Sequence, residues 1–168
     1  MFTRLLLAID DSSGSEVATA FATALARHHG ASVHVFHVNE YLVGGRGPTL
    51  RTQADATALL AGVVHELRTA GLTATGSSIR ATYREVPRRI AAAAQERGCD
   101  AIVLGAERHR RLGRLFSPNV CARTSRLTSL PVVTAPSPLD VSVTARLTVD
   151  DVARQQFERQ TVVAPELR

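Results

Sequence analysis

The feature that most limits the fold of this chain is a regular alternation between short apolar runs and longer amphipathic segments. The first run, Leu5–Ile9, is apolar throughout, which is typical of a strand buried on both faces. In the next segment Val17, Phe21 and Leu25 recur at helical spacing, and Gly30 marks the end of that helix. Parallel strands need crossovers long enough for a helix, so the pattern predicts a parallel, doubly wound α/β sheet.

The alternation continues to about residue 135 and predicts five strands and four helices. The segment Ser13-Gly14-Ser15-Glu16 has the pattern of a capping box, so we expect the first helix to begin there. The expected strands are 5–9, 32–38, a segment within 73–82, 101–104 and 131–134, and the later helices are 51–70, 87–97 and 117–128. The predicted fold class is a three-layer, Rossmann-like α/β fold of five mainly parallel strands, with a main domain over residues 1–136.

Residues 137–168 follow a different pattern. Apolar and polar residues alternate strictly from Val141 to Val149, which predicts a half-buried strand over 141–149, followed by a helix over 149–160. Elements this small do not bury their own apolar faces. This C-terminal extension is therefore expected to dock on the main domain or on a second subunit.

The basic residues are unusual in kind and in distribution. All 20 are arginine, and the lack of lysine excludes a P-loop lysine, a Schiff base and Ser–Lys mechanisms. Residues 136–168 hold five carboxylates and four arginines, which leaves a net charge of +6 for residues 1–135, concentrated in the four arginines of Arg108–Arg114. Such a local cluster favours a small anionic ligand over nucleic acid, because the chain also has few aromatic residues on which bases could stack. The alternative is that the arginines form a solvated basic loop without a ligand.

Other classes of site have little support in the sequence. No apolar stretch approaches the roughly 18 residues of a membrane span, and no signal peptide is recognisable, so we expect a cytoplasmic protein without a membrane partner. Cys99 and Cys121 are too few for a metal site, and His34 and His37 lie on a predicted buried strand, so all four are expected in the core. Catalytic motifs are missing, and we expect no catalytic residue, no metal ligand and no enzyme activity beyond a weak ATPase.

Candidate ligand-binding residues follow two of the predicted strands, at the sheet edge where doubly wound folds bind ligands. Asp10 follows the first strand, where its carboxylate either accepts hydrogen bonds from a ligand or caps the next helix. Gly105 follows the fourth strand directly, a place where backbone approaches a ligand closely. The helix predicted to begin at Pro118 offers free N–H groups to a phosphate, although the proline removes one donor.

The order of these segments resembles the universal stress protein family. The matching stretches are Leu5–Ser12 (LLLAIDDS), Val35–Val38 (VFHV), Val86–Ile90 (VPRRI), Gly98–Gly105 (GCDAIVLG) and Leu130–Val133 (LPVV). The resemblance covers residues 1–135. It implies an adenine-nucleotide alpha-hydrolase-like fold, a homodimer formed through the last strand of that domain, and a regulatory role in the stress response. The family divides into branches that bind ATP and branches that do not.

The ATP-binding branch carries Gly-x-x-Gly, nine further residues, and then Gly followed by Ser or Thr. Gly105 keeps the first glycine, whereas Arg108, Pro118 and Asn119 stand at the other three positions. Asp10 matches the family's acidic position beside base and ribose, and Val38 matches its adenine-contacting position. The nucleotide-binding residues that the resemblance implies are Ala8, Asp10, Val38, Gly105, Arg108, Pro118, Asn119 and Val120.

The resemblance thus implies a pocket for ATP or another adenine nucleotide that has diverged at its phosphate end, with Mg²⁺ bound only alongside ATP. Arg108 either fills the phosphate end or clamps a shorter phosphate chain through its guanidinium group. The alternative is a dimeric interaction protein of the same family that binds no nucleotide. The sequence does not identify a protein partner.

Overall fold

A computed structural model describes residues 1–40, 52–105 and 120–135. All of these residues belong to one unit of the chain, Met1–Ser137. The second unit, Pro138–Arg168, lies outside the described residues, and so do the predicted strand 141–149 and helix 149–160.

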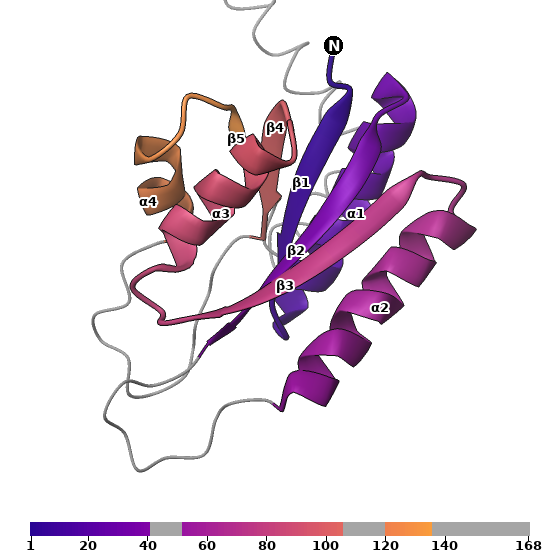
Figure 1. The fold of residues 1–168 in the computed structure, drawn as a ribbon. Helices are drawn as coiled ribbons and strands as arrows, with labels where there is room; N and C mark the ends of the chain where they lie inside the picture. Colours follow the sequence, from indigo (N-terminus) through magenta and orange to yellow (C-terminus); the bar gives the residue numbers. More distant parts are fainter. Residues whose placement is uncertain (41–51, 106–119, 136–168) are drawn as a thin grey trace, which may run out of the picture. The chain divides into compact units, whose positions relative to one another are not determined.

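Five strands alternate with four helices in the described part of the chain (Figure 1). The strands are β1 (Arg4–Ile9), β2 (Ser32–Glu40), β3 (Ala74–Ala81), β4 (Ala101–Leu104) and β5 (Val132–Thr134). The helices are α1 (Ser13–His29), α2 (Gln53–Thr69), α3 (Val86–Glu96) and α4 (Val120–Arg126). The predicted alternation is confirmed; the predicted start of the last helix at Ser117-Pro118 lies outside the described residues.

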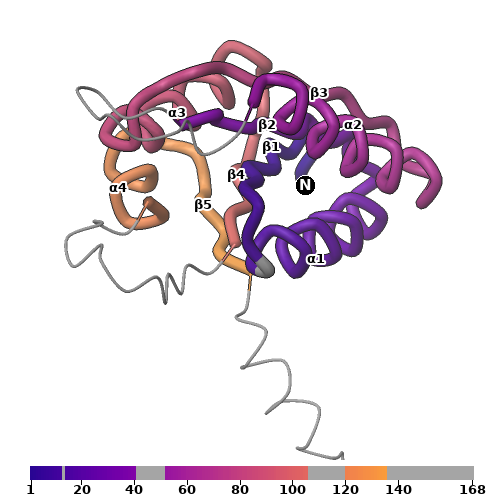
Figure 2. The backbone as a smooth tube through the Cα atoms, turned by 90° about the horizontal axis from the view of Figure 1, so that it is seen from below, coloured from indigo at the N-terminus to yellow at the C-terminus, as the bar shows by residue number. Residues whose placement is uncertain are grey.

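The sheet has the strand order β3-β2-β1-β4-β5, and every described strand pair is parallel. The chain moves outward from β1 to β3 and then returns to the other side of β1 with β4 and β5. Figure 2 shows α1 and α2 on one side of the sheet and α3 and α4 on the other. The predicted doubly wound α/β fold is therefore confirmed, with its reversal of strand order between β1 and β4.

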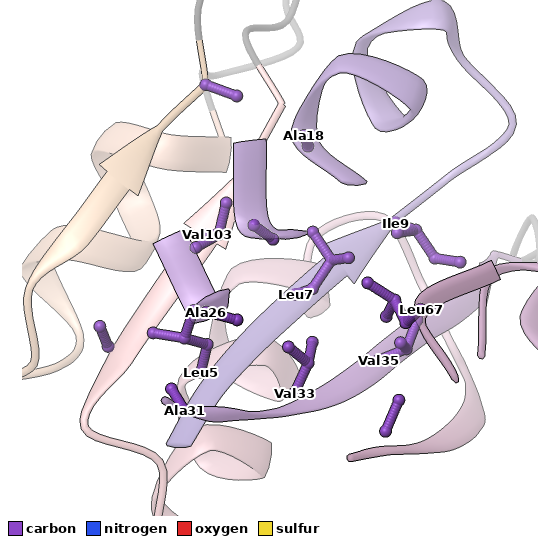
Figure 3. Close-up of a cluster of buried hydrophobic side chains, with 14 residues drawn as sticks. Leu5, Leu7, Ile9, Ala18, Ala26, Ala31, Val33, Val35, Leu67 and Val103 are labelled. Atoms are coloured by element: carbon purple, nitrogen blue, oxygen red, sulfur yellow. The ribbon is translucent and has the colours of Figure 1, made fainter. Parts of the chain in front are cut away.

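Each face of the sheet carries its own apolar cluster. Leu5, Leu7 and Ile9 of β1 pack with β2, α1 and α2 on one face (Figure 3). Leu6 lies on the opposite face, with Phe36 and residues of α3 and β4. β1 is therefore buried on both faces, which explains its uninterrupted run of apolar residues.

The predicted capping box at Ser13–Glu16 is wrong. The N-cap of α1 is Ser12, whose side chain makes no capping hydrogen bond and instead donates its hydroxyl hydrogen to Oδ1 of Asp10. A hydrogen bond to an ionised carboxylate is stronger than one between neutral groups, so it orients the Ser12 hydroxyl toward Asp10 and not toward the N–H groups of the helix. A capping box does form at α2, where the side chains of Thr52 and Asp55 each accept a hydrogen bond from the other residue's backbone N–H, both at 3.1 Å.

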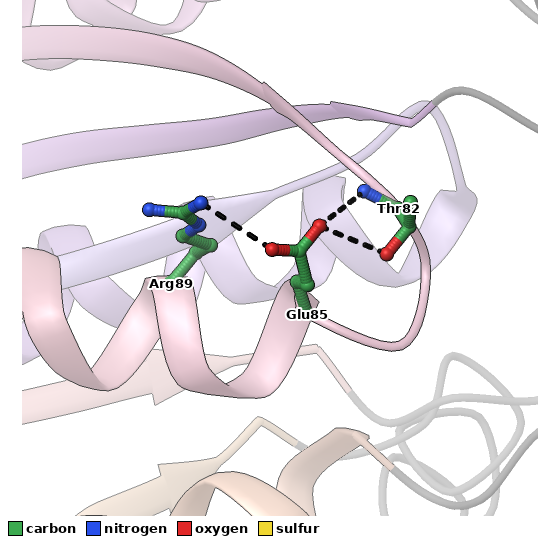
Figure 4. Close-up of polar contacts among 3 residues, drawn as sticks. All are labelled: Thr82, Glu85 and Arg89. Atoms are coloured by element: carbon green, nitrogen blue, oxygen red, sulfur yellow. Dashed lines mark hydrogen bonds and ion pairs between the residues drawn. The ribbon is translucent and has the colours of Figure 1, made fainter. Parts of the chain in front are cut away.

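A carboxylate also connects the end of β3 with the start of α3. Glu85, the N-cap residue of α3, accepts hydrogen bonds from the backbone N–H of Thr82 at 3.1 Å and from its hydroxyl at 2.9 Å (Figure 4). These bonds, the backbone one first, lower the pKa of Glu85, and the guanidinium of Arg89 at 3.3 Å acts in the same direction. The turn therefore holds α3 in place although Pro87 removes one N–H donor from its first turn.

Asp100 joins the amino ends of β1 and β4. Its Oδ2 accepts hydrogen bonds from the backbone N–H of Thr3 at 2.6 Å and from the Thr3 hydroxyl at 2.8 Å, and its Oδ1 accepts one from the N–H of Arg4 at 3.2 Å. Desolvation raises the pKa of Asp100, but these hydrogen bonds together outweigh it and hold the pKa below its usual value of 3.8. The ionised carboxylate is therefore the form that stabilises the fold.

We expect the Asp100→Asn variant to lose about 1 kcal/mol of unfolding free energy at pH 7, since an amide accepts these hydrogen bonds less strongly and the site is only partly buried. Because the folded-state pKa is lowered, this contribution is complete above the usual pKa and is lost as the pH falls through the lowered one. Urea unfolding of both proteins at pH 7 and pH 3 measures it. Equal stability at pH 7 would contradict this role.

Candidate functional site

The candidate site lies at the carboxyl edge of the sheet, where the strand order reverses between β1 and β4. The structure describes five of the eight sequence-predicted site residues: Ala8, Asp10, Val38, Gly105 and Val120. The other three, Arg108, Pro118 and Asn119, lie outside the described residues.

Three of the predicted residues pack against the same apolar cluster. Ala8 near the end of β1, Val38 on β2 and Val120 at the start of α4 are all half-buried and pack against the same core cluster, on the α3 and α4 side of the sheet. They come from three separate parts of the chain. The fold therefore places all three at the margin of one core cluster, on the same side of the sheet.

Asp10 directly follows β1 and is half-buried. Its Oδ1 accepts hydrogen bonds from the backbone N–H of Ser12 at 2.9 Å, from the Ser12 hydroxyl and from the Ser15 hydroxyl at 2.7 Å. The Ser15 Oγ in turn accepts a bond from the N–H of Asp10 at 2.7 Å. The carboxylate thus orders the turn between β1 and α1. This differs from the predicted capping role, because the N-cap of α1 is Ser12.

Gly105 directly follows β4, and its lack of a side chain has a clear structural reason. A Cβ atom at this position would lie 2.6 Å from the carbonyl oxygen and 2.8 Å from the carbonyl carbon of Gly14. The first turn of α1 therefore rests directly on the backbone at the end of β4. This contact explains why residue 105 is a glycine: packing within the protein leaves no space for a side chain, and the explanation needs no ligand.

Gly14 and Ser15 are site-forming residues that the sequence interpretation did not identify as such. A signal was present, because glycine inside the first turn of a helix is unfavourable by propensity and indicates a close approach by another segment. The residue that makes this close approach, Gly105, is distant in the sequence, so no pattern near Gly14 identifies it.

The two cysteines lie in different environments. Cys99 is buried in the core, and desolvation raises the pKa of its thiol to about 11, so it stays protonated and inert at neutral pH. Cys121 on α4 is half-buried, and its Sγ lies 3.6 Å from the carbonyl oxygen of Gly105. The predicted core position is thus confirmed for Cys99, whereas Cys121 lies at the margin of the candidate site.

Both histidines of β2 are buried and hydrogen-bonded, as predicted. Nδ1 and Nε2 of His34 lie 2.8 Å from the hydroxyls of Thr75 and Ser77, respectively. Desolvation, with smaller contributions from the positive charges of Arg97 and Arg4, lowers the pKa of His34. His37 is bonded through Nδ1 to the carbonyl oxygen of Ile9 at 3.0 Å, directly before Asp10.

The arrangement as a whole combines half-buried aliphatic residues with a carboxylate at a sheet edge. Such a combination suits a ligand that is flat and apolar on one part and carries N–H or O–H donors on another.

Among the described residues, no group of three or more His, Cys, Asp or Glu side chains is placed to hold a metal ion. None of the described helices has the length and apolar character needed to cross a membrane.

Comparison with known structures shows the same fold in 80% of this chain. A protein of the universal stress protein family from Burkholderia pseudomallei superposes with a TM-score of 0.63 at 22% identity, over 80% of this chain and 96% of that one. The universal stress protein of Archaeoglobus fulgidus in complex with dAMP gives 0.59 at 25% identity, over 80% and 98%. A universal stress protein in complex with cAMP gives 0.61 at 17% identity, over 79% and 95%.

Comparison of the sequence with curated proteins gives no match. The sequence model of the universal stress protein family, in contrast, matches residues 1–136, which include every described residue. The expected resemblance is thereby confirmed at the level of the family: the chain belongs to the universal stress protein family.

Proposed function

We propose that this protein is a cytoplasmic regulatory module of the stress response that binds an adenine nucleotide at the carboxyl edge of β1, β2 and β4. The observation that carries the proposal is that three half-buried aliphatic residues, Ala8, Val38 and Val120, lie at the margin of one core cluster, and that the carboxylate of Asp10 follows β1 at the carboxyl edge of the sheet. An adenine ring packs well on aliphatic side chains, and a carboxylate accepts hydrogen bonds from ribose hydroxyls or an amino group. The dAMP complex of the Archaeoglobus fulgidus protein and the cAMP complex of another family member support this choice of ligand.

The phosphate end of the proposed site differs from the family pattern. Arg108, Pro118 and Asn119 stand where the ATP-binding branch has two glycines and a hydroxyl residue. Fewer backbone N–H groups are then free to approach a triphosphate, whereas one guanidinium group suffices to hold a single phosphate. We therefore propose that the protein prefers a nucleoside monophosphate to ATP, and that Mg²⁺ takes part only when ATP is bound.

We expect adenine nucleotides to raise the unfolding free energy of the protein. A ligand present at about 100 times its dissociation constant adds about 2.7 kcal/mol. Thermal unfolding with dAMP, AMP, cAMP, ADP, and ATP with and without Mg²⁺ measures the effect, and GMP serves as the control for a general anion effect. Lack of a shift with every adenine nucleotide at millimolar concentration would refute nucleotide binding.

The Asp10→Asn variant separates the two roles of this residue. Asparagine keeps an Oδ1 acceptor for Ser12 and Ser15 but removes the negative charge and one acceptor oxygen. We expect the variant to stay folded and to bind the nucleotide about tenfold more weakly in titration calorimetry, since a hydrogen bond to a charged group is lost. An unchanged affinity would remove Asp10 from the proposed site.

The second candidate function is a dimeric interaction protein that binds no nucleotide. It is favoured by the contact between Gly14 and Gly105, which explains the one retained glycine of the motif without a ligand. β5 forms an edge of the described sheet, so we propose that a homodimer forms through this edge. Sedimentation of the full chain tests the dimer, and a parallel assay of ATP turnover tests the proposal that the protein is not an enzyme.

A further inference from the structure

We propose that His37 is a positioning residue of the nucleotide site: it fixes the peptide unit that precedes Asp10 and thereby sets the direction of the Asp10 carboxylate. The inference rests on the nucleotide-binding function proposed above. Its structural basis is a buried imidazole at the last residue pair between β1 and β2, where Ile9 lies opposite His37 and the next residue of the chain is Asp10.

Both ends of one peptide unit are held by side chains from other parts of the chain. The carbonyl oxygen of Ile9 lies 3.0 Å from Nδ1 of His37, and the N–H of the same unit, which belongs to Asp10, donates to Oγ of Ser15 at 2.7 Å. A peptide unit is planar, so two bonds at its opposite ends fix the orientation of the whole plane. The bond from Asp10 N to its Cα lies in this plane, and its direction determines where the carboxylate can reach.

His37 acts on Asp10 through the backbone. Side chains alternate between the faces of a strand, so His37 shares the face of Val33 and Val35, which α1 and α2 cover. Val38, in contrast, lies on the face that carries the candidate site. The imidazole is only 4% exposed. Its role is therefore to orient Asp10, and it is not placed to contact the ligand itself.

The chemistry of this hydrogen bond determines which substitution preserves it. A carbonyl oxygen only accepts, so Nδ1 of His37 must carry a proton to form this bond. In the described part of the chain Nε2 is buried and has no hydrogen-bond partner. Asparagine places its amide nitrogen near the position of Nδ1, whereas the amide group of glutamine reaches toward that of Nε2.

The test compares His37→Asn with His37→Gln. His34→Gln is the matched control, because His34 is the other buried imidazole of β2 and its hydrogen bonds lead to β3 and not to Asp10. Titration calorimetry with dAMP well below the melting temperatures should give dissociation constants within twofold of wild type for His37→Asn and His34→Gln. For His37→Gln we expect binding about fivefold to tenfold weaker, the effect of one lost buried hydrogen bond.

A second readout needs no ligand. The backbone amide signal of Asp10 in ¹⁵N NMR spectra should move in His37→Gln and stay near its wild-type position in His37→Asn. Equal affinities of the two His37 variants, or an equal loss in His34→Gln, would overturn the proposal. If the wild-type protein binds no adenine nucleotide, the proposed function fails. The Asp10 amide signal then tests the positioning role by itself: if the signal does not move in His37→Gln, His37 does not position Asp10.

Discussion

Replacing Gly105 by valine is expected to destabilise the protein by about 3 kcal/mol or more, because the new side chain has no space. Even the Cβ atom would lie 2.6 Å from the carbonyl oxygen of Gly14, and this neighbour is helix backbone, which cannot rotate away as a side chain can. To relieve the overlap, the first turn of α1 must move away from the end of β4. Chemical denaturation monitored by circular dichroism measures the loss.

Gly62 provides the control for this substitution. It lies in the middle of α2, and a Cβ atom there would meet nothing within 4 Å. Gly62→Ala should therefore stabilise the protein by up to about 1 kcal/mol, the difference in helix propensity between the two residues. If Gly105→Val were as stable as wild type, the contact between α1 and β4 would not exist in solution.

Truncation of Leu67 to alanine is expected to cost about 3–4 kcal/mol. Leu67 is fully buried and, with Ala56, is one of two buried residues by which α2 packs on the sheet; Figure 3 shows it beside Val35. The lost apolar contacts and the cavity left behind both contribute, since the backbone of a parallel sheet does not collapse to fill the space.

The matched control for Leu67→Ala is Leu127→Ala, which removes the same atoms from a side chain that is 53% exposed. It should change the unfolding free energy by no more than about 0.5 kcal/mol. Urea unfolding of both variants gives the comparison. Similar losses at the two positions would mean that α2 does not depend on Leu67 for its packing.

Most of the secondary structure was predictable because its signals are local. The uninterrupted apolar run of β4 gave its bounds, 101–104, as observed, and Gly30 and Gly98 adopt the positive φ angles of 68° and 60° that end α1 and α3. The sequence pattern of a capping box occurs at the start of α1, but the box itself forms only at α2 among the described helices. At α1 the hydroxyl of the N-cap Ser12 donates to the carboxylate of Asp10, the residue after β1.

For the candidate site, the sequence predicts a set of residues but not how the five described ones are arranged. Asp10 and Gly105 were identified because they follow buried strands, and the motif around Gly98–Gly105 carried the family resemblance. In the structure that motif has structural roles: Gly98 ends a helix, Asp100 joins two strands and Gly105 packs on α1. These residues therefore identify the family and its fold, and their packing and hydrogen bonds account for them without a ligand.

The sequence by itself determined the alternation of strands and helices, the parallel sheet and the family. The reason is that hydrophobic periodicity and glycine positions are signals contained within short stretches of the chain. Only the tertiary structure decided that Gly14 rests on Gly105 and that His37 holds the peptide unit before Asp10. These contacts join segments that are distant in the sequence, and they exist only once β1 lies between β2 and β4. No local pattern contains that information, since it follows from the packing of the whole sheet.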